Sequence, residues 1–290
     1  MTDTILAAPA ADEAIAPVVP ATGGTMRRRR IPDGPLRIGR WGPPLLVLAA
    51  VVGLWYFLSL VVLGERNFML PPPHEVFGVF AVEKTRLDIF EAFLTTMQVA
   101  LVGLAISAII GIVWAIAMNQ ARWVERSTFP YAVILQSIPI LAIAPLIGLW
   151  VTDSFWARVV VCILIALFPM VSNTLFGLQS VDRSHRELFK LQRASRMTVL
   201  AKLELPAAMP AIFAGLRISA GLAVVGAIVG DFFYQNGVVG IGALIRKYQS
   251  RLDNPELFAT VILASVFGVV VFLLFGLIAR LAVGKWYDFS

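Results

Sequence analysis

The side chains that most often do chemistry in proteins are few in this sequence and stand far apart. The two histidines, His74 and His185, lie outside the long apolar runs, and the single cysteine, Cys162, lies inside one. A hydrolase acting within a membrane needs a histidine beside an embedded serine, and a zinc site needs clustered histidine, cysteine or carboxylate ligands. The positions of these residues meet neither need. We therefore expect no catalytic residues, no metal site and no bound cofactor.

ATP binding through a P-loop is not expected either. That loop needs the pattern Gly-x-x-x-x-Gly-Lys followed by Ser or Thr, because its backbone N–H groups surround the phosphates. The nearest match, Gly284-Lys285, continues with Trp286 and lacks the upstream glycine. We predict that the chain is not an enzyme, and that any ATP hydrolysis takes place on a separate subunit.

One charged side chain stands clearly inside an apolar run. Arg217 lies about ten residues into the run 207–232, whereas Asp231 closes that run and is expected at the outer membrane interface. Transporters driven by an ion gradient usually place ionisable residues near the middle of the bilayer. Arg217 can extend its charged head to the inner headgroups, or it can serve helix packing or a solute pathway.

The composition is that of a membrane protein. Hydrophobic residues make up 59% of the 290 residues and charged residues 14%, with a mean hydropathy of +0.82. Soluble proteins average about a quarter charged residues. In a soluble chain the net charge of +6 would suggest nucleic acid as a partner. Here the basic residues lie between apolar runs, so they indicate control of membrane topology instead.

Six apolar runs approach or exceed the length of about 20 residues that spans a bilayer. Backbone groups in lipid must be satisfied internally, so each run should be a helix. We predict an all-α integral membrane fold of about six transmembrane helices in one domain, residues 41–285. The third run contains Pro130, Pro139 and Pro145 and is expected to be broken. The runs are 43–63, 92–118, 128–150, 157–175, 207–232 and 257–281.

Lysine and arginine are distributed unevenly between the two sides of the predicted membrane. Residues 1–40 are rich in Ala and Pro, and we predict a disordered cytoplasmic tail that carries the cluster Arg27–Arg30. With the N-terminus inside, the inner segments hold sixteen Lys and Arg and the outer segments seven, Arg158 among them. Inner loops carry an excess of these residues, so both termini are expected to be cytoplasmic.

Two runs carry small residues every four positions, a spacing that lets helix backbones approach closely. They are Gly103, Ser107 and Gly111 in the run 92–118, and Gly215, Ser219, Ala223 and Ala227 in the run 207–232. Ordinary packing within one bundle accounts for such stripes. In the second interpretation these glycines and serines, together with Arg217, form a subunit interface or line the solute pathway.

The polar segment between the fourth and fifth runs, residues 177–206, is the most unusual part of the chain. It is 30 residues long, whereas helix connections usually have about two to eight. Ser184 and Glu187 have capping-box spacing, which predicts a helix starting near residue 184. Leu188 and Leu191 lie on one face, and basic residues lie on the other. Such a helix suits a groove on a partner protein or an anionic lipid surface.

The same segment resembles the coupling motif of permease subunits of binding-protein-dependent ABC importers. The motif reads Glu-Ala-Ala, three residues, Gly, nine residues, then a hydrophobic residue, any residue and Leu-Pro. Glu187 takes the position of the glutamate, and the closing positions are Leu203, Leu205 and Pro206. The spacing between the opening and closing positions is that of the motif.

The sequence departs from the motif in its middle. Leu188 and Phe189 stand where the motif has alanines, and Arg193 stands where it has glycine. Most residues other than glycine resist positive φ angles, so the resemblance does not fix the turn at this position. The continuation Arg193-Ala194-Ser195 and the residues after it are similar to the nitrate, sulfonate and taurine branch of the family.

Further segments that look like this branch follow in the same order along the chain, so the resemblance covers roughly residues 41–285. They are residues 70–76, 137–146, 168–173 and 237–242. The resemblance implies a type I importer permease of the cell membrane, with a cytoplasmic coupling helix between its fourth and fifth spans. The residues that it implies for ATPase coupling are Glu187, Leu188, Phe189, Arg193, Ala194, Ser195, Leu203 and Pro206.

The partners that the resemblance implies are cytoplasmic ABC ATPase subunits, a second permease subunit and an extracytoplasmic solute-binding protein, in addition to the lipid bilayer. The permease pair can be a homodimer or a heterodimer. The solutes of the branch imply a small anion or sulfonate, or a heterocyclic vitamin or its precursor. The alternative is a secondary transporter driven by an ion gradient, which the scarcity of charged residues within the runs disfavours.

Overall fold

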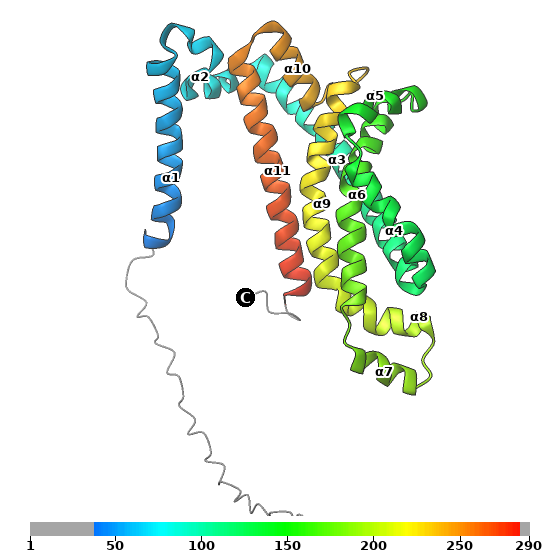
Figure 1. The fold of residues 1–290 in the computed structure, drawn as a ribbon. Helices are drawn as coiled ribbons and strands as arrows, with labels where there is room; N and C mark the ends of the chain where they lie inside the picture. The colour runs from blue at the N-terminus through cyan, green and yellow to red at the C-terminus, as the bar shows by residue number, and fades with distance from the viewer. Residues whose placement is uncertain (1–37, 285–290) are drawn as a thin grey trace, which may run out of the picture. The chain divides into compact units, whose positions relative to one another are not determined.

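A computed structural model describes residues 38–284 of the chain, with side chains from residue 42 onward (Figure 1). The predicted tail up to residue 37, with its arginine cluster, lies outside these residues. The chain divides into two units after Leu48, and the larger unit begins at Ala49. The described residues form helices and turns and include no strand, which confirms the all-α prediction.

Eleven α-helices occur in the described residues. They are α1 (Ile38–Phe57), α2 (Pro73–Gly78), α3 (Glu83–Gln120), α4 (Arg122–Ser137), α5 (Ile140–Trp150), α6 (Ser154–Gln179), α7 (Arg183–Leu191), α8 (Arg196–Val199), α9 (Leu205–Phe233), α10 (Ile241–Arg251) and α11 (Asn254–Val283). Short 3₁₀ or π stretches supplement them at Leu58–Val62, Gly64–Met69, Val79–Ala81 and Leu200–Glu204. The last of these stretches joins α8 to α9 without a turn.

Five helical stretches in the described part of the chain are long and apolar enough to cross a membrane. They are Gly42–Val62, Glu83–Gln120, Ser154–Gln179, Arg196–Phe233 and Asn254–Val283. The pair α4 and α5 passes the same test only when taken together, which gives a sixth candidate span. The prediction of about six spans is therefore confirmed as five continuous helices and one bent pair.

The bend between α4 and α5 measures 102°, and Pro139 explains where it occurs. A proline disfavours helical geometry in the residue before it. Ile138 accordingly has an extended ψ of 125°, and Pro139 becomes the N-cap of α5. Pro130 and Pro145 lie inside α4 and α5 and end neither helix. One of the three prolines in this run thus produces the predicted break.

Helix α6 packs between α3 and α9, and both small-residue stripes face it. Gly103 of α3 lies against the side chain of Cys162. Gly226 of α9 comes so close to the same residue that an added Cβ would lie 2.8 Å from its Cα. The Ser219 hydroxyl donates a hydrogen bond of 2.8 Å to the carbonyl oxygen of Ala166. Small side chains on α3 and α9 therefore allow both helices to reach the α6 backbone.

Two further glycines of the stripes, Gly111 and Gly215, also lie against α6. A Cβ added to Gly111 would lie 2.6 Å from the Cβ of Met170. A Cβ added to Gly215 would lie 3.0 Å from the carbonyl oxygen of Pro169. Ser107 is buried and bonds within its own helix. Packing within one bundle thus accounts for both stripes. Because α6 covers these residues, a permease–permease interface would have to use other surfaces.

The outward face of α11 remains apolar and exposed. Leu273, Leu277 and Leu281 lie on this face with more than half of their surface accessible. An exposed apolar surface of this extent on a soluble protein would mark an interaction site. In a helix of spanning length it is the surface expected to meet lipid tails.

The tight contact between α9 and α6 predicts a large effect of one methyl group. We expect Gly226→Ala to lower the free energy of unfolding by about 1–3 kcal/mol, because overpacking forces backbone shifts. Gly53→Ala is the matched control, since nothing lies within 4 Å of an added Cβ there. Thermal unfolding of the detergent-purified variants measures both effects. Equal melting temperatures for the two variants would contradict the packing described here.

Candidate functional site

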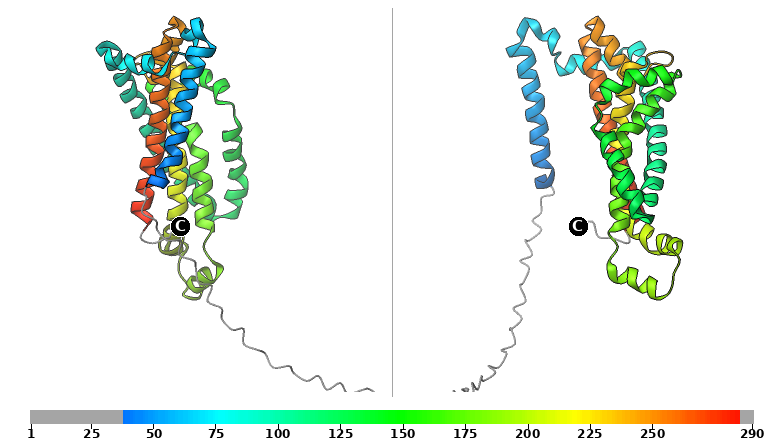
Figure 2. Two further views of the ribbon diagram at one scale, coloured as in Figure 1. Left: turned by 90° about the vertical axis from the view of Figure 1, so that its left-hand side faces the viewer. Right: turned by 45° about the vertical axis from the view of Figure 1, so that its right-hand side comes forward.

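Helices α7 and α8 project beyond the ends of α6 and α9 at one end of the bundle (Figures 1 and 2). Helix α7 begins at Arg183, close to the predicted start, but the predicted capping box is wrong. Asp182 is the N-cap residue and its side chain makes no cap hydrogen bond, whereas Ser184 already lies within the first turn. The helix is therefore held by contacts other than a local cap.

The outer surface of α7 and α8 is apolar at several points. Leu188 and Leu191 are 51% and 82% exposed, and Met197 of α8 is 71% exposed. Glu187 is also exposed, whereas Phe189 is half-buried. The structure thus brings the predicted residues Glu187 and Leu188 to an accessible surface and turns Phe189 partly inward.

Arg193 ends α7 in the conformation that the family glycine would adopt. Its φ of 51° is left-handed. The N–H of Arg193 bonds to the carbonyl oxygen of Lys190, and the N–H of Ala194 bonds to that of Phe189. This pair of bonds is the Schellman arrangement, which most often uses glycine at the left-handed position. A left-handed turn is thus formed here by arginine, at the position where the motif has glycine.

The other predicted coupling residues lie between this turn and α9. The Ser195 hydroxyl caps α8 by accepting a hydrogen bond of 3.2 Å from the backbone N–H of Thr198. Leu203 is half-buried in the π stretch before α9, and Pro206 is the second residue of α9. These residues set the path of the chain from α7 back into the bundle.

A buried carboxylate connects α7 to three long helices. Glu204 is 8% exposed, and one of its oxygens accepts a 2.7 Å hydrogen bond from Asn119 at the end of α3. Its other oxygen lies 3.5 Å from the guanidinium of Arg186 on α7. The same guanidinium donates to the carbonyl oxygen of Leu178 on α6 over 2.8 Å. A displacement of α7 is thereby linked to α3, α6 and α9.

Sequence reasoning missed Glu204, which occupies the unrestricted position between Leu203 and Leu205 of the coupling motif. The sequence did contain a signal for it, because Glu204 is an acidic residue among apolar ones at the start of a span. A charge at such a place needs a partner. Asn119, its neighbour at the end of α3, carried no comparable signal.

The opposite end of the bundle contains a buried ion pair. The Arg158 guanidinium lies 3.1 Å from the Asp231 carboxylate, and the two side chains are 2% and 0% exposed. Arg158 lies in the second turn of α6, which begins at Ser154. Asp231 is buried near the end of α9.

Hydrogen bonds connect this pair to α3 and α10. The Thr96 hydroxyl donates to Asp231 over 2.7 Å and accepts from the N–H of Ile241 over 2.8 Å. Arg158 donates two bonds to the carbonyl oxygen of Tyr234, of 3.0 and 2.6 Å. The segment between α9 and α10 is thus tied to α3 and α6.

Tyr234 links this network to α5. Its hydroxyl donates to the carbonyl oxygen of Ala144, and its ring lies beside Gly148. Burial raises the pKa of Tyr234, which keeps the hydroxyl protonated and available as a donor. The ion pair and this tyrosine together hold five helices at this end of the bundle.

Arg217 packs between two helices. Its guanidinium carbon lies 3.9 Å from the ring centroid of Phe272, within the range of a cation–π contact. Its guanidinium also approaches the backbone of Gly276 on α11. Among the interpretations open for Arg217, the geometry favours helix packing between α9 and α11.

An apolar cavity lies at the bend between α4 and α5. Its volume is about 580 Å³, and its walls come from α4, α5, α6 and α9. Ile138, Phe168 and Leu222 are among the lining residues. The cavity lies beside the broken span. Irregular backbone at membrane depth is tolerated where it is buried in protein or lines a water-filled cavity.

Comparison with known proteins identifies the class to which this fold and coupling segment belong. Residues 107–285 match the family of binding-protein-dependent transport system inner membrane components. This is well over half of the chain, and the chain therefore belongs to that family of ABC transporter permeases, which are multi-pass inner membrane proteins.

Several curated relatives share this similarity over most of their length. The formylaminopyrimidine transport permease of Halalkalibacterium halodurans is 32% identical over 75% of this chain and 88% of its own. The riboflavin transport system permease of Chloroflexus aurantiacus is 31% identical over 84% and 90%. The nitrate import permease of Leptolyngbya laminosa is 28% identical over 87% and 94%.

A solved structure supports the fold independently. A chain from the crystal structure of an amino acid ABC transporter with histidines matches with a TM-score of 0.56 and 16% identity. The match covers 71% of this chain and 97% of the other. The predicted resemblance to ABC importer permeases is thus confirmed by sequence and by fold.

The buried ion pair predicts a strong and non-additive stability effect. We expect Arg158→Met to lower the free energy of unfolding by about 3–5 kcal/mol, because Asp231 would stay buried without a counter-charge. The double variant Arg158→Met/Asp231→Leu should cost less than the sum of the two single variants. Chemical unfolding in mixed micelles measures all three variants. Strictly additive losses would show that the two charges do not interact.

The left-handed residue that ends α7 predicts a stabilising substitution. We expect Arg193→Gly to stabilise α7 by about 1 kcal/mol, because it relieves the cost of the left-handed conformation. Gln192→Gly is the control, since Gln192 has a φ of −77° and gains nothing from glycine. Amide hydrogen exchange over residues 183–191 reports both effects. Slower exchange in the control than in Arg193→Gly would contradict the assignment.

Proposed function

We propose that this chain is the transmembrane subunit of an ATP-driven importer and forms its solute pathway. ATP hydrolysis takes place on separate cytoplasmic ATPase subunits, which dock on α7 and α8. Closure of the ATPases moves α7, and the helices joined to α7 change the access of the pathway from one side of the membrane to the other.

The observation that carries this proposal is that α7 has an exposed apolar face and also forms an ion pair with a buried carboxylate of the bundle. Leu188 and Leu191 offer apolar surface to a partner groove, a recognised mode of helix binding. Arg186, on the same helix, pairs with the buried Glu204. Force applied to the exposed face therefore reaches the spanning helices through a charged contact rather than through a flexible loop.

The orientation that we propose places α7 and both termini in the cytoplasm. The inner segments hold sixteen Lys and Arg and the outer segments seven. This charge bias supports the orientation. ATPase subunits are cytoplasmic, so docking on α7 and α8 requires this orientation.

We further propose that the solute is a heterocyclic vitamin or its precursor, delivered by an extracytoplasmic solute-binding protein. The relatives named for formylaminopyrimidine and riboflavin are both above 30% identity. The relatives named for nitrate and aliphatic sulfonates are at 25–28%. The apolar cavity of about 580 Å³ suits part of an uncharged ring compound better than a small anion. A small anion or sulfonate is the second candidate.

A second permease subunit, identical or different, completes the proposed assembly. Membrane importers with one pathway place it between two such subunits. The stripes on α3 and α9 are covered by α6, so the exposed faces of other helices supply the contact. The ion-gradient alternative finds little support, because the buried charges Arg158 and Asp231 already neutralise each other.

Docking on α7 predicts a charge-sensitive association. We expect Leu188→Asp to reduce co-purification of the ATPase subunit at least tenfold, because the substitution places a carboxylate in an apolar contact. Glu187→Ala should weaken association less. Membrane insertion should be unchanged, as shown by yield and helicity.

The matched control for this experiment is Leu252→Asp. Leu252 is 73% exposed and lies between α10 and α11, at the other end of the bundle. It should leave ATPase association intact. Recovery of the ATPase at the wild-type level with Leu188→Asp would refute docking on α7.

The proposed solute class is tested on the solute-binding protein that serves this permease. A ligand that binds only the folded protein raises its melting temperature by mass action. At a hundred times its Kd, a pyrimidine precursor or a flavin should stabilise the protein by about 2.7 kcal/mol. Nitrate and taurine at the same concentration should not. Stabilisation by nitrate or taurine alone would assign the permease to anion import.

A further inference from the structure

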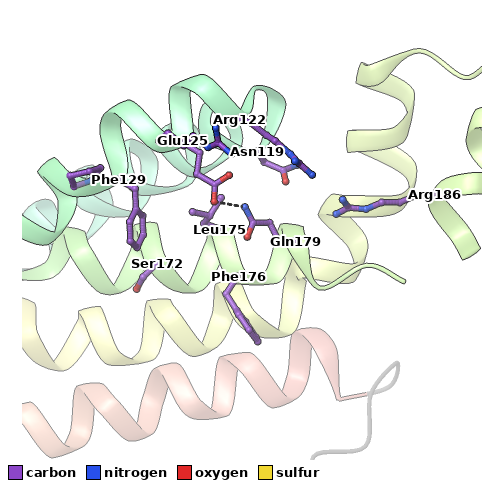
Figure 3. Close-up of a pocket in the computed structure, with 11 residues that line it drawn as sticks. Asn119, Arg122, Glu125, Phe129, Ser172, Leu175, Phe176, Gln179 and Arg186 are labelled. Carbon is purple, nitrogen blue, oxygen red and sulfur yellow. Dashed lines mark hydrogen bonds between the residues drawn. The ribbon is translucent and has the colours of Figure 1, made fainter. Parts of the chain in front are cut away.

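A second cavity, of about 790 Å³, opens between α4 and α6 at the end of the bundle that carries α7 (Figure 3). Its walls come from the first turns of α4, the last turns of α6, the end of α3 and one side chain of α7. The coupling contact described above borders it through Arg186, and the proposed solute pathway does not use it.

The charged wall of this cavity is predominantly basic. Arg122 and Arg126 lie one turn apart on the same face of α4 and line the cavity together with Arg186 of α7. Figure 3 shows the side chain of Arg186 extending from α7 toward the end of α4 that carries Arg122. The acidic residue among the lining residues is Glu125, which accepts a hydrogen bond of 2.9 Å from Gln179. Within residues 42–284, neither Arg122 nor Arg126 forms an ion pair. The lining thus contains two arginines that form no ion pair in these residues and one carboxylate, Glu125.

Arg186 is only partly used by its contacts with the protein. One terminal nitrogen serves both Glu204 and the carbonyl oxygen of Leu178. Its Nε is buried and has no hydrogen-bond partner in the described part of the chain. Nε is closed to a ligand as it is to water, but the side chain is 34% exposed and lines the cavity. An acceptor in the cavity can therefore bind the accessible part of the guanidinium.

The cavity changes from charged to apolar along the helix axes. With a rise of 1.5 Å per residue, Arg122 and Phe129 are separated by about 10 Å along α4. Phe176 of α6 is 72% exposed and lies on the opposite wall. A free inorganic ion would use only the charged end. A molecule with an anionic head and an apolar chain would match both ends.

The surroundings place this charged end at a membrane surface. Trp123, next to Arg122, is 72% exposed, and exposed tryptophan is characteristic of the membrane–water interface. Basic pockets between spanning helices on the cytoplasmic side bind anionic lipid headgroups. Charge, polarity gradient and position therefore agree on one class of ligand.

We propose that this cavity binds the headgroup of an anionic phospholipid from the cytoplasmic leaflet. The phosphate lies between Arg122, Arg126 and Arg186, and the first part of an acyl chain lies against Phe129 and Phe176. The leaflet assignment rests on the proposed orientation, with α7 in the cytoplasm. Through Arg186 the bound lipid stabilises the contact that joins α7 to the spans.

The test is lipid titration of the delipidated full-length protein, followed by native mass spectrometry. The wild type should bind phosphatidylglycerol more tightly than phosphatidylcholine. The double variant Arg122→Gln/Arg126→Gln should lose phosphatidylglycerol affinity about 30-fold, because each basic contact near an anionic lipid contributes a factor of about five. The control Arg66→Gln/Arg251→Gln removes two exposed arginines at the other end of the bundle and should bind as the wild type does.

Three results would overturn the proposal. They are equal binding of the two lipids by the wild type, an equal loss of affinity in the control, and displacement of phosphatidylglycerol by millimolar inorganic phosphate, which would assign the cavity to a soluble anion. ATPase co-purification with the same preparations separates this proposal from the proposed function. If lipid selectivity is absent while the ATPase still docks, only the lipid site fails.

Discussion

The close contact of α3 and α9 with the backbone of α6 is the constraint on which the rest of the structure depends. Glycine at 103 and 226 allows both helices to reach Cys162. In lipid, helix association gains little from the hydrophobic effect and relies on close packing and hydrogen bonds. Larger side chains at these positions would separate the three helices. The polar contacts at both ends of the bundle would then no longer meet.

A buried carboxylate lies at each end of this three-helix unit. Asp231 pairs with Arg158 at one end, and Glu204 pairs with Arg186 at the other. Taking a charge out of water is costly unless it is paired and hydrogen-bonded, so both contacts resist separation. The first pair lies wholly within the spanning bundle. The second reaches α7, so a movement of that helix is passed to α3, α6 and α9.

Much of this architecture could be predicted from the sequence, because long apolar runs have few alternatives in a membrane. The apolar runs predicted the spans, and the three prolines of the third run predicted a break, which falls at Pro139. The spacing from Glu187 to Pro206 predicted the coupling segment. The pairing of Arg158 with Asp231 could not be predicted, since the two residues are distant in the sequence and each lies near the end of a run. Glu204 was missed because the motif leaves its position unrestricted. The capping box predicted at Ser184 was wrong, because the spacing of Ser184 and Glu187 does not show which residue starts the helix.

The central claim is that the chain receives force from an ATPase at α7 and α8. Amide hydrogen exchange of the permease, alone and in complex with its ATPase subunit, tests this most directly. The structure predicts slower exchange over residues 183–199 when the ATPase is bound, and unchanged exchange over residues 234–253 at the other end. Unchanged exchange over 183–199, or protection confined to 234–253, would contradict the claim.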